Sequence, residues 1–160
     1  MDTNSVFDEF GNEFYYKDDK LHRENGPAVI YQDGSSFWFI DDKFHRIEGP
    51  AVERSNGGKE WWINGKLHRE DGPAIESPNG DKKWYKNGKR HREDGPSLEF
   101  LNGDRYWFLD DKPHRENGPA IDLSCGFKQY MINGEIHRTD GPAVEGNKRK
   151  EFWENNRYIL

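Results

Sequence analysis

Residues 61–76 read Trp-Trp-Ile-Asn-Gly-Lys-Leu-His-Arg-Glu-Asp-Gly-Pro-Ala-Ile-Glu, and this stretch decides the fold because its pattern returns along the chain every 23 residues. Each copy carries one histidine, and the set is His22, His45, His68, His91, His114 and His137. Arginine follows each histidine, and Gly-Pro begins three residues after the arginine. Self-similarity at a fixed period of about 20–50 residues is the signature of a solenoid or array. The sequence therefore predicts six stacked copies of one unit.

Two turn signals bracket an aromatic pair in each copy. A glycine, as in Asn79-Gly80, comes before the pair, and Asn-Gly, as in Asn64-Gly65, comes after it. Asn-Gly between apolar residues favours a two-residue β-hairpin turn. Three copies carry Asp-Asp at the second turn, and these are Asp18-Asp19, Asp41-Asp42 and Asp110-Asp111. We expect the Asp-Asp turns to widen, because aspartate tolerates the left-handed region less well than glycine.

The Gly-Pro step must bend the strand that returns from the second turn, because proline has no N–H to donate to a sheet. Each copy is then a short aromatic strand, a tight turn and a return broken at Gly-Pro. The return counts either as one bent strand or as two strands, and the sequence leaves both open.

The predicted fold is all-β, an elongated antiparallel stack of β-hairpins that forms a single repeat domain over residues 1–160. Six 23-residue repeats fill residues 11–148, and half-repeats at residues 1–10 and 149–160 act as caps. Ser5-Val6-Phe7 is in phase with Ala28-Val29-Ile30, and Phe152-Trp153 is in phase with Lys83-Trp84.

Composition alone leans toward disorder, with 32% hydrophobic residues, 34% charged residues and a mean hydropathy of −1.19. The 14% aromatic content argues the other way, because a few bulky rings can build a thin core. Two columns of equivalent residues are predicted to form that core. They are Trp38, Trp61, Trp84 and Trp107, and Val29, Val52, Ile75, Leu98, Ile121 and Val144.

Several classes of function are disfavoured by simple features. The start, Met1–Asn4, has neither a basic region nor an apolar run, so we expect neither a signal peptide nor a membrane span. The one cysteine, Cys125, cannot form an internal disulfide, which favours the cytoplasm. The net charge of −6 opposes binding to nucleic acid.

The histidines do not predict a metal site or another cofactor. Equivalent histidines in a stack would lie roughly 10 Å apart, whereas the ligands of one zinc ion lie within about 2.1 Å of it. Residues that break the repeat, such as Cys125 and Glu135, do not bring a nucleophile and a base together at a recognisable spacing. We therefore expect no enzyme activity, and we expect the His-Arg pairs to bond the Gly-Pro bend or a neighbouring repeat.

Charged residues also recur in columns. The basic column is Lys20, Lys43, Lys66, Lys89 and Lys112, and the acidic column is Glu53, Glu76, Glu99, Asp122 and Glu145. A solvated, partly ion-paired surface explains both, and a basic groove for an anionic ligand is the alternative.

The second aromatic of each pair offers a candidate partner-binding surface. Adjacent strand residues point to opposite faces, so a buried tryptophan column would leave its neighbours facing outward. This outer column consists of Tyr16, Phe39, Trp62, Tyr85, Phe108 and Met131. Exposed aromatics in a row would be a binding surface. The alternative is that the Gly-Pro segment covers them as a second core layer.

The run Trp61–His68, with its 23-residue period, resembles the MORN repeat, whose units are β-hairpins stacked into elongated sheets. The likeness covers essentially the whole chain. After the histidine, this sequence continues Arg69–Ala74 where the MORN pattern continues His-Gly-x-Gly. The variant is similar to repeats common in bacteriophage and large-virus proteins of unassigned role. The resemblance implies a scaffold or a partner- or membrane-associating module rather than a catalyst.

These features lead to a functional expectation and a rival. We expect a cytoplasmic, non-catalytic protein whose stack covers a protein partner, and the resemblance extends this to a virus-encoded modulator of a host system. The rival is a protein that sequesters a nucleotide or sugar in pockets lined by aromatics and arginine. The apolar end, residues 157–160, would leave strand hydrogen-bonding groups open, so a homodimer through this edge is a further hypothesis.

Overall fold

The computed structural model describes residues 4–146 and 149–159, and in them the chain is all-β. No helix occurs in these residues, and so none is long and apolar enough to cross a membrane. The chain divides into an N-terminal unit, Met1–Pro78, and a C-terminal unit, Asn79–Leu160. Both units are built from antiparallel hairpins repeated along the sequence, which confirms the predicted fold class.

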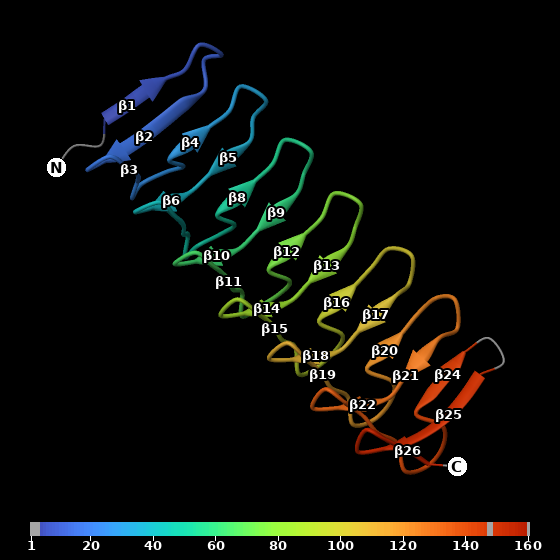
Figure 1. Cartoon of the computed structure of the whole chain (residues 1–160). Helices are drawn as coiled ribbons and strands as arrows, with labels where there is room; N and C mark the ends of the chain where they lie inside the picture. The colour runs from blue at the N-terminus through green and yellow to red at the C-terminus, as the bar shows by residue number, and fades with distance from the viewer. Residues whose placement is uncertain (1–3, 147–148, 160) are drawn as a thin grey trace. The chain divides into compact units, whose positions relative to one another are not determined.

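The N-terminal unit contains one sheet and the beginnings of a series of small hairpins. Its strands are β1 (Asn4–Phe7), β2 (Glu13–Lys17), β3 (Lys20–Leu21), β4 (Val29–Ile30), β5 (Ser36–Phe37), β6 (Phe39–Ile40), β7 (Lys43–Phe44), β8 (Val52–Glu53), β9 (Lys59–Glu60), β10 (Trp62–Ile63), β11 (Lys66–Leu67) and β12 (Ile75–Glu76). The sheet runs in the order β1-β2-β4-β5-β8-β9-β12. Figure 1 shows β4–β5 and β8–β9 as successive hairpins of this sheet.

The C-terminal unit repeats the same plan. Its strands are β13 (Lys82–Lys83), β14 (Tyr85–Lys86), β15 (Lys89–Arg90), β16 (Leu98–Glu99), β17 (Arg105–Tyr106), β18 (Phe108–Leu109), β19 (Lys112–Pro113), β20 (Ile121–Asp122), β21 (Lys128–Gln129), β22 (Met131–Ile132), β23 (Glu135–Ile136), β24 (Val144–Gly146), β25 (Arg149–Glu154) and β26 (Arg157–Ile159). The sheet order is β13-β16-β17-β20-β21-β24-β25-β26.

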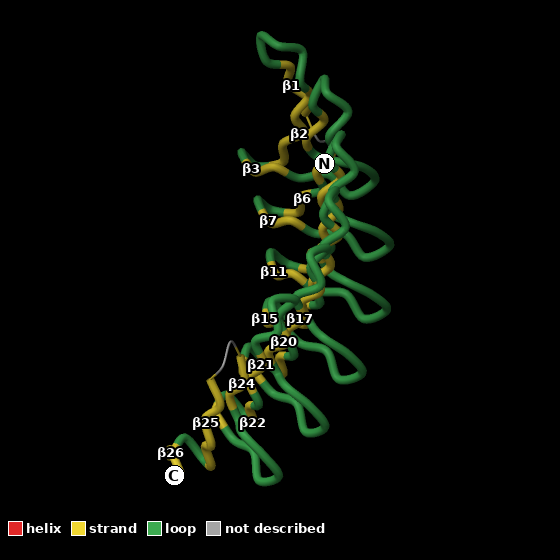
Figure 2. Tube along the Cα trace, turned by 90° about the vertical axis from the view of Figure 1, so that its right-hand side faces the viewer, coloured by secondary structure: helices red, strands yellow, loops and turns green. Residues whose placement is uncertain are grey.

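Each repeat therefore holds two hairpins, and the open question about the return is answered. In the second full copy, β5 and β8 pair in the sheet, while β6 and β7 form a separate small hairpin. The chain then passes through Gly49-Pro50 and re-enters the sheet as β8, so the return consists of two strands. Figure 2 shows the consequence, because the strand segments in yellow are short and long green loops separate them.

The small hairpins close through two-residue turns in which both residues have positive φ. Asn64 and Gly65 have φ of 50° and 75°, and Asp41 and Asp42 have φ of 49° and 62°. Both turns give the same register, with Ile63 opposite Lys66 and Ile40 opposite Lys43. The expected widening of the Asp-Asp turns is therefore wrong. The Asp42 carboxylate accepts a hydrogen bond of 2.8 Å from the Leu21 N–H of the preceding repeat, and this bond helps to hold the strained backbone.

The innermost residues are smaller than predicted. They form a column of side chains with 0% exposure, namely Ala28, Ala51, Ala74, Ser97, Ala120 and Ala143. Val29, Val52 and Val144 of the predicted apolar column are also buried, and its other members are half-buried. The tryptophan column, Trp38, Trp61, Trp84 and Trp107, is only half-buried, so its assignment to the continuous core is wrong.

The predicted alignment of the half-repeats with the 23-residue repeat is confirmed at the N-terminal end and wrong at the C-terminal end. Val6 lies opposite Phe14 as Val29 lies opposite Phe37, which is the expected phase. Near the C-terminus, Trp153 lies opposite Tyr158, as Met131 lies opposite Ile136, so Trp153 belongs to the outer column. The reason is that the connection from Val144 to Glu151 is one residue shorter than that from Ile121 to Gln129. Residues 1–3, 147–148 and 160 of the predicted caps and edge lie outside the described residues.

Candidate binding grooves between the His-Arg loops

The segment from each histidine to the following proline forms a loop that joins a small hairpin to the sheet, and we call these segments the His-Arg loops. Backbone bonds fix each loop at its start. In the second loop, the His45 N–H donates to the Trp38 carbonyl at 3.1 Å. The next N–H, that of Arg46, donates to the Trp62 carbonyl of the following repeat at 3.1 Å. The loop is thus tied to its own repeat and to the next one.

The arginine of each loop lies flat over the first aromatic of its own repeat. The distance from the guanidinium carbon to the ring centroid is 3.9 Å for Arg46 on Trp38 and 3.8 Å for Arg69 on Trp61. The other pairs lie between 3.6 and 4.0 Å, and they are Arg23 on Tyr15, Arg92 on Trp84, Arg115 on Trp107 and Arg138 on Tyr130. These cation–π contacts explain why the tryptophan column is not core, since one ring face is covered by a charged group instead.

The Gly-Pro step supplies the remaining contacts of the guanidinium. Nη1 of Arg92 donates to the Pro96 carbonyl at 3.2 Å, and the same bond occurs in every copy, with distances of 3.0 to 3.2 Å. A Cβ at Gly95 would lie 2.7 Å from the Arg92 guanidinium carbon. Glycine is required there because the guanidinium occupies the space of a side chain. The predicted structural role of the arginines at the Gly-Pro bend is confirmed.

In the described part of the chain, carboxylates bind three of these arginines from two directions and Arg46 from one. The acidic column supplies one partner, as in the 2.9 Å bond between Arg92 Nη1 and Glu99. The position two residues after the arginine supplies another, as in the 2.8 Å bond between Arg92 Nε and Asp94. The guanidinium holds the pKa of the Asp94 carboxyl below its usual value, through the hydrogen bond first and its charge second. The acidic column is therefore partly ion-paired, as the sequence predicted.

The histidines join consecutive repeats through Nδ1. His22 Nδ1 lies 2.8 Å from Asp41 of the next repeat, and since a carboxylate only accepts, this nitrogen donates. The hydrogen bond lowers the pKa of the Asp41 carboxyl. His45 Nδ1 lies 2.9 Å from the side-chain oxygen of Asn64 and 3.2 Å from its backbone nitrogen. The predicted bonding of the histidines to a neighbouring repeat is confirmed.

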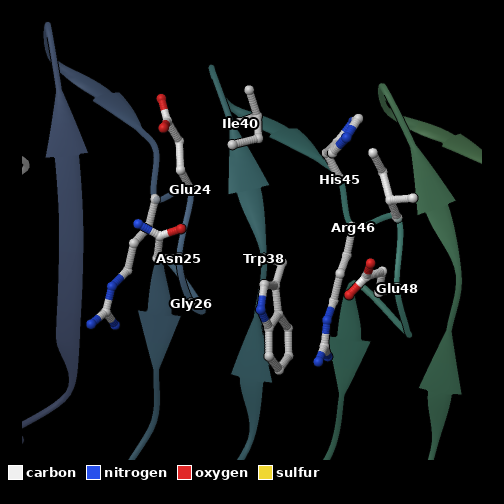
Figure 3. A pocket seen from close by; sticks show the side chains of 10 residues that line it. Glu24, Asn25, Gly26, Trp38, Ile40, His45, Arg46 and Glu48 are labelled. Atoms are coloured by element: carbon white, nitrogen blue, oxygen red, sulfur yellow. The ribbon is translucent and has the colours of Figure 1, made fainter.

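Grooves lie between successive His-Arg loops. One of about 610 Å³ is bounded by the loops that begin at His22 and His45 and has Trp38 in its lining. In Figure 3 the Trp38 ring stands between Asn25 of the first loop and Arg46 of the second. Two further grooves, of about 550 and 570 Å³, adjoin the loop that begins at His114, one on each of its sides. In all three, the lining holds the aromatic ring, its arginine, and the two residues that follow the arginine of the preceding loop.

The outer column is partly covered, to a different degree from one member to the next. Phe108 is 7% exposed and is part of the core. The other five predicted binding residues, Tyr16, Phe39, Trp62, Tyr85 and Met131, are half-buried. In the N-terminal unit Phe44 covers two of them, with its ring centroid 4.3 Å from that of Phe39 and 5.5 Å from that of Trp62. For these two residues, part of the cover comes from a small hairpin, to which Phe44 belongs.

The groove residues escaped the prediction of sites from sequence. The two residues after each arginine hold eight acidic residues and no basic residue. These residues are Glu24, Asn25, Ile47, Glu48, Glu70, Asp71, Glu93, Asp94, Glu116, Asn117, Thr139 and Asp140. The constant spacing between tryptophan, arginine and Gly-Pro was the available signal. Within residues 4–146 and 149–159, no group of three or more His, Cys, Asp or Glu side chains is arranged to hold a metal ion.

Comparisons with known proteins place the chain in no family. A scan against models of protein families found no match, and a search of curated proteins found none.

Proposed function

We propose that this chain is a non-catalytic binding protein that holds a protein partner against the grooves between its His-Arg loops. The observation that carries the proposal is the recurrence of one groove design. Arg115, Glu116 and Asn117 line the grooves on both sides of their loop. A partner segment that crosses this loop meets the same kinds of side chain twice. Repeated contacts of this kind add affinity without any single strong site.

The composition of the grooves also supports a protein partner. Arginine and tryptophan are the residues that most often dominate the binding energy of protein interfaces. Here both are held rigid by stacking, so little side-chain entropy is lost on binding. The resemblance to MORN repeats, which implies a scaffold or partner-binding module, points the same way.

A small-ligand function is the second candidate, and the size of the grooves favours it. Volumes of about 550 to 610 Å³ fall within the roughly 300–1,000 Å³ of small-molecule sites. A thermal-shift screen of nucleotides and sugars tests this candidate. A ligand at about 100 times its dissociation constant should stabilise the protein by about 2.7 kcal/mol.

Variants on two surfaces test the leading proposal. The double variant Glu48→Arg, Glu116→Arg changes two exposed groove residues. The control variant Trp62→Ser, Tyr85→Ser changes the outer column. Partners captured from lysate by the unaltered chain should be lost with the groove variant and kept with a folded control variant. Loss with the control alone would return the binding surface to the outer column, and binding by both would refute both surfaces.

A further inference from the structure

Two of the six loop arginines lack the carboxylates that the other four have. In the described part of the chain, Arg46, Arg69, Arg92 and Arg138 form ion pairs with glutamates seven residues later, at 2.6 to 2.9 Å. Arg69, Arg92 and Arg138 also donate through Nε to an aspartate two residues later, at 2.7 to 2.9 Å. Arg23 and Arg115 have neither kind of ion pair among the described residues.

The sequence explains both vacancies. Two residues after Arg115 stands Asn117, and the equivalent residue for Arg23 is Asn25, so an amide replaces the aspartate. Seven residues after Arg115 stands Asp122, which is one methylene shorter than the glutamate of the other repeats. The equivalent residue for Arg23 is Ile30, which cannot accept a hydrogen bond.

The two arginines are nevertheless held as rigidly as the others. Arg115 lies 3.8 Å from the Trp107 ring centroid, and its Nη1 donates to the Pro119 carbonyl at 3.2 Å. Arg23 lies 3.6 Å from the Tyr15 ring centroid, and its Nη1 donates to the Pro27 carbonyl at 3.1 Å. Each guanidinium is therefore positioned, while its Nε–H has no acceptor in the described residues. The Nε–H of Arg46 has none there either, but that guanidinium is already ion-paired with Glu53.

Both vacant donors belong to groove walls. Arg23 lines the groove beside Trp38, and Arg115 lines the two grooves on either side of its own loop. A guanidinium with fixed geometry and free donors binds a carboxylate well, because it loses little entropy and forms a charge-assisted hydrogen bond. Three other His-Arg loops of this chain already contain such an arginine–carboxylate pair, in which an aspartate supplies the carboxylate.

We propose that Arg23 and Arg115 each receive a carboxylate of the protein partner, in the place that the chain's own aspartate fills beside Arg69, Arg92 and Arg138. This inference rests on the proposed function, because it names the chemistry that the partner brings to the grooves. A carboxylate fits better than a phosphate, since Glu24 and Glu116 stand next to the two arginines and repel a doubly charged anion more strongly.

The first experiment uses acetate as the probe and follows the Nε–H signals of the arginines by NMR in low salt. The signals of Arg23 and Arg115 should shift and saturate, whereas those of Arg69, Arg92 and Arg138 should stay in place. Equal response of all five signals, or no response of Arg23 and Arg115, would overturn the proposal. A parallel titration with inorganic phosphate distinguishes the source. Binding more than about tenfold tighter than that of acetate would overturn the carboxylate assignment.

Two single substitutions serve as matched controls, because one adds and the other removes the carboxylate two residues after a loop arginine. Asn117→Asp should supply the missing carboxylate and abolish the acetate response of Arg115. Asp94→Asn should remove the carboxylate that accepts from Nε of Arg92, so the Arg92 Nε–H signal should begin to respond to acetate. Unchanged backbone amide spectra would show that both variants are folded. Persistence of the Arg115 response in Asn117→Asp would refute the assigned position.

Partner binding separates this inference from the function on which it rests. A captured partner should bind the Asn117→Asp variant at least about tenfold more weakly. Unchanged binding to that variant, together with loss in the Glu48→Arg, Glu116→Arg variant, would refute the carboxylate site and leave the proposed function intact. If Arg115 responds to acetate but the partner binds the Glu48→Arg, Glu116→Arg variant as well as the unaltered chain, the proposed function is refuted instead.

Discussion

Replacing Gly95 with alanine should destabilise the protein through one side chain, that of Arg92. The new methyl would lie 2.7 Å from the guanidinium carbon and 3.0 Å from Nε and Nη2. Since Pro96 and Trp84 fix the guanidinium on its other sides, the side chain must leave its seat. Gly95 does not have the positive φ that would penalise alanine by itself.

The expected loss follows from the contacts of Arg92. The cation–π contact with Trp84 is worth about 0.5–2 kcal/mol, and the hydrogen bond of a charged donor to the Pro96 carbonyl about 1.5–3 kcal/mol. The ion pair with Glu99 is partly solvated and adds about 0–1 kcal/mol, and the ion pair with the exposed Asp94 is left out of the sum. Alanine also restricts the unfolded chain, which returns about 0.4–1 kcal/mol. We expect a net loss of about 2–4 kcal/mol in the free energy of unfolding.

Urea denaturation in a double-mutant cycle tests this reasoning. In the Arg92→Ala background, Gly95→Ala should cost almost nothing, because the clash has no partner. Gly26→Ala is the matched control, since its Cβ would meet the Arg23 guanidinium carbon at 3.2 Å and Arg23 has no ion pair to lose in the described residues. A full cost of Gly95→Ala in the Arg92→Ala background would refute the role assigned to the guanidinium.

Three further outcomes are expected. Phe108→Ala should cost roughly 3–5 kcal/mol, and Trp107→Ala clearly less, because Phe108 is buried and Trp107 is not; the reverse order in thermal denaturation would restore the tryptophan column to the core. The hydrogen bond from Arg90 lowers the pKa of the Asp111 carboxyl, so its stabilising contribution is present above the unfolded value near about 3.9 and is lost as the pH falls through the folded value. Asp111→Asn should therefore flatten the decline of stability in acid, and an unchanged acid profile would contradict this. Deleting residues 157–160 should convert a dimer to a monomer by light scattering, since Tyr158 and Ile159 are exposed, and a mass that is monomeric before deletion would rule out this edge.

The repeat, the hairpins and the turns could be predicted because each depends on local chemistry. Asn64-Gly65 requires positive φ in any context, and the structure provides it. The same reasoning failed for Asp41-Asp42, because it underestimated how readily aspartate adopts positive φ. Asp18-Asp19 forms the same two-residue turn, and no bond from a preceding repeat to Asp19 occurs among the described residues.

The two faces of the aromatic pair could not be assigned from alternation alone. Alternation says only that the Trp38 and Phe39 side chains point to opposite faces of the strand, and it does not say which of the two is buried. The decision lies eight residues downstream, where Arg46 covers the Trp38 ring, and in the small hairpin, where Phe44 packs on Phe39. The sequence shows that Asn117 replaces the aspartate found at this position in three other repeats. Only the structure shows that those aspartates bind the loop arginine, and therefore that Arg115 lacks a carboxylate partner at this position.

The forward ties of the His-Arg loops have a consequence for how such a chain can change length. The Arg46 N–H and the His45 ring both bond to the next repeat, and no bond of this kind reaches beyond it among the described residues of the N-terminal unit. Because each repeat recognises only its immediate neighbour, gene duplication or loss of one whole 23-residue block leaves every remaining junction chemically intact. The number of grooves is then adjustable by evolution or by an engineer, in whole steps, without redesigning the fold.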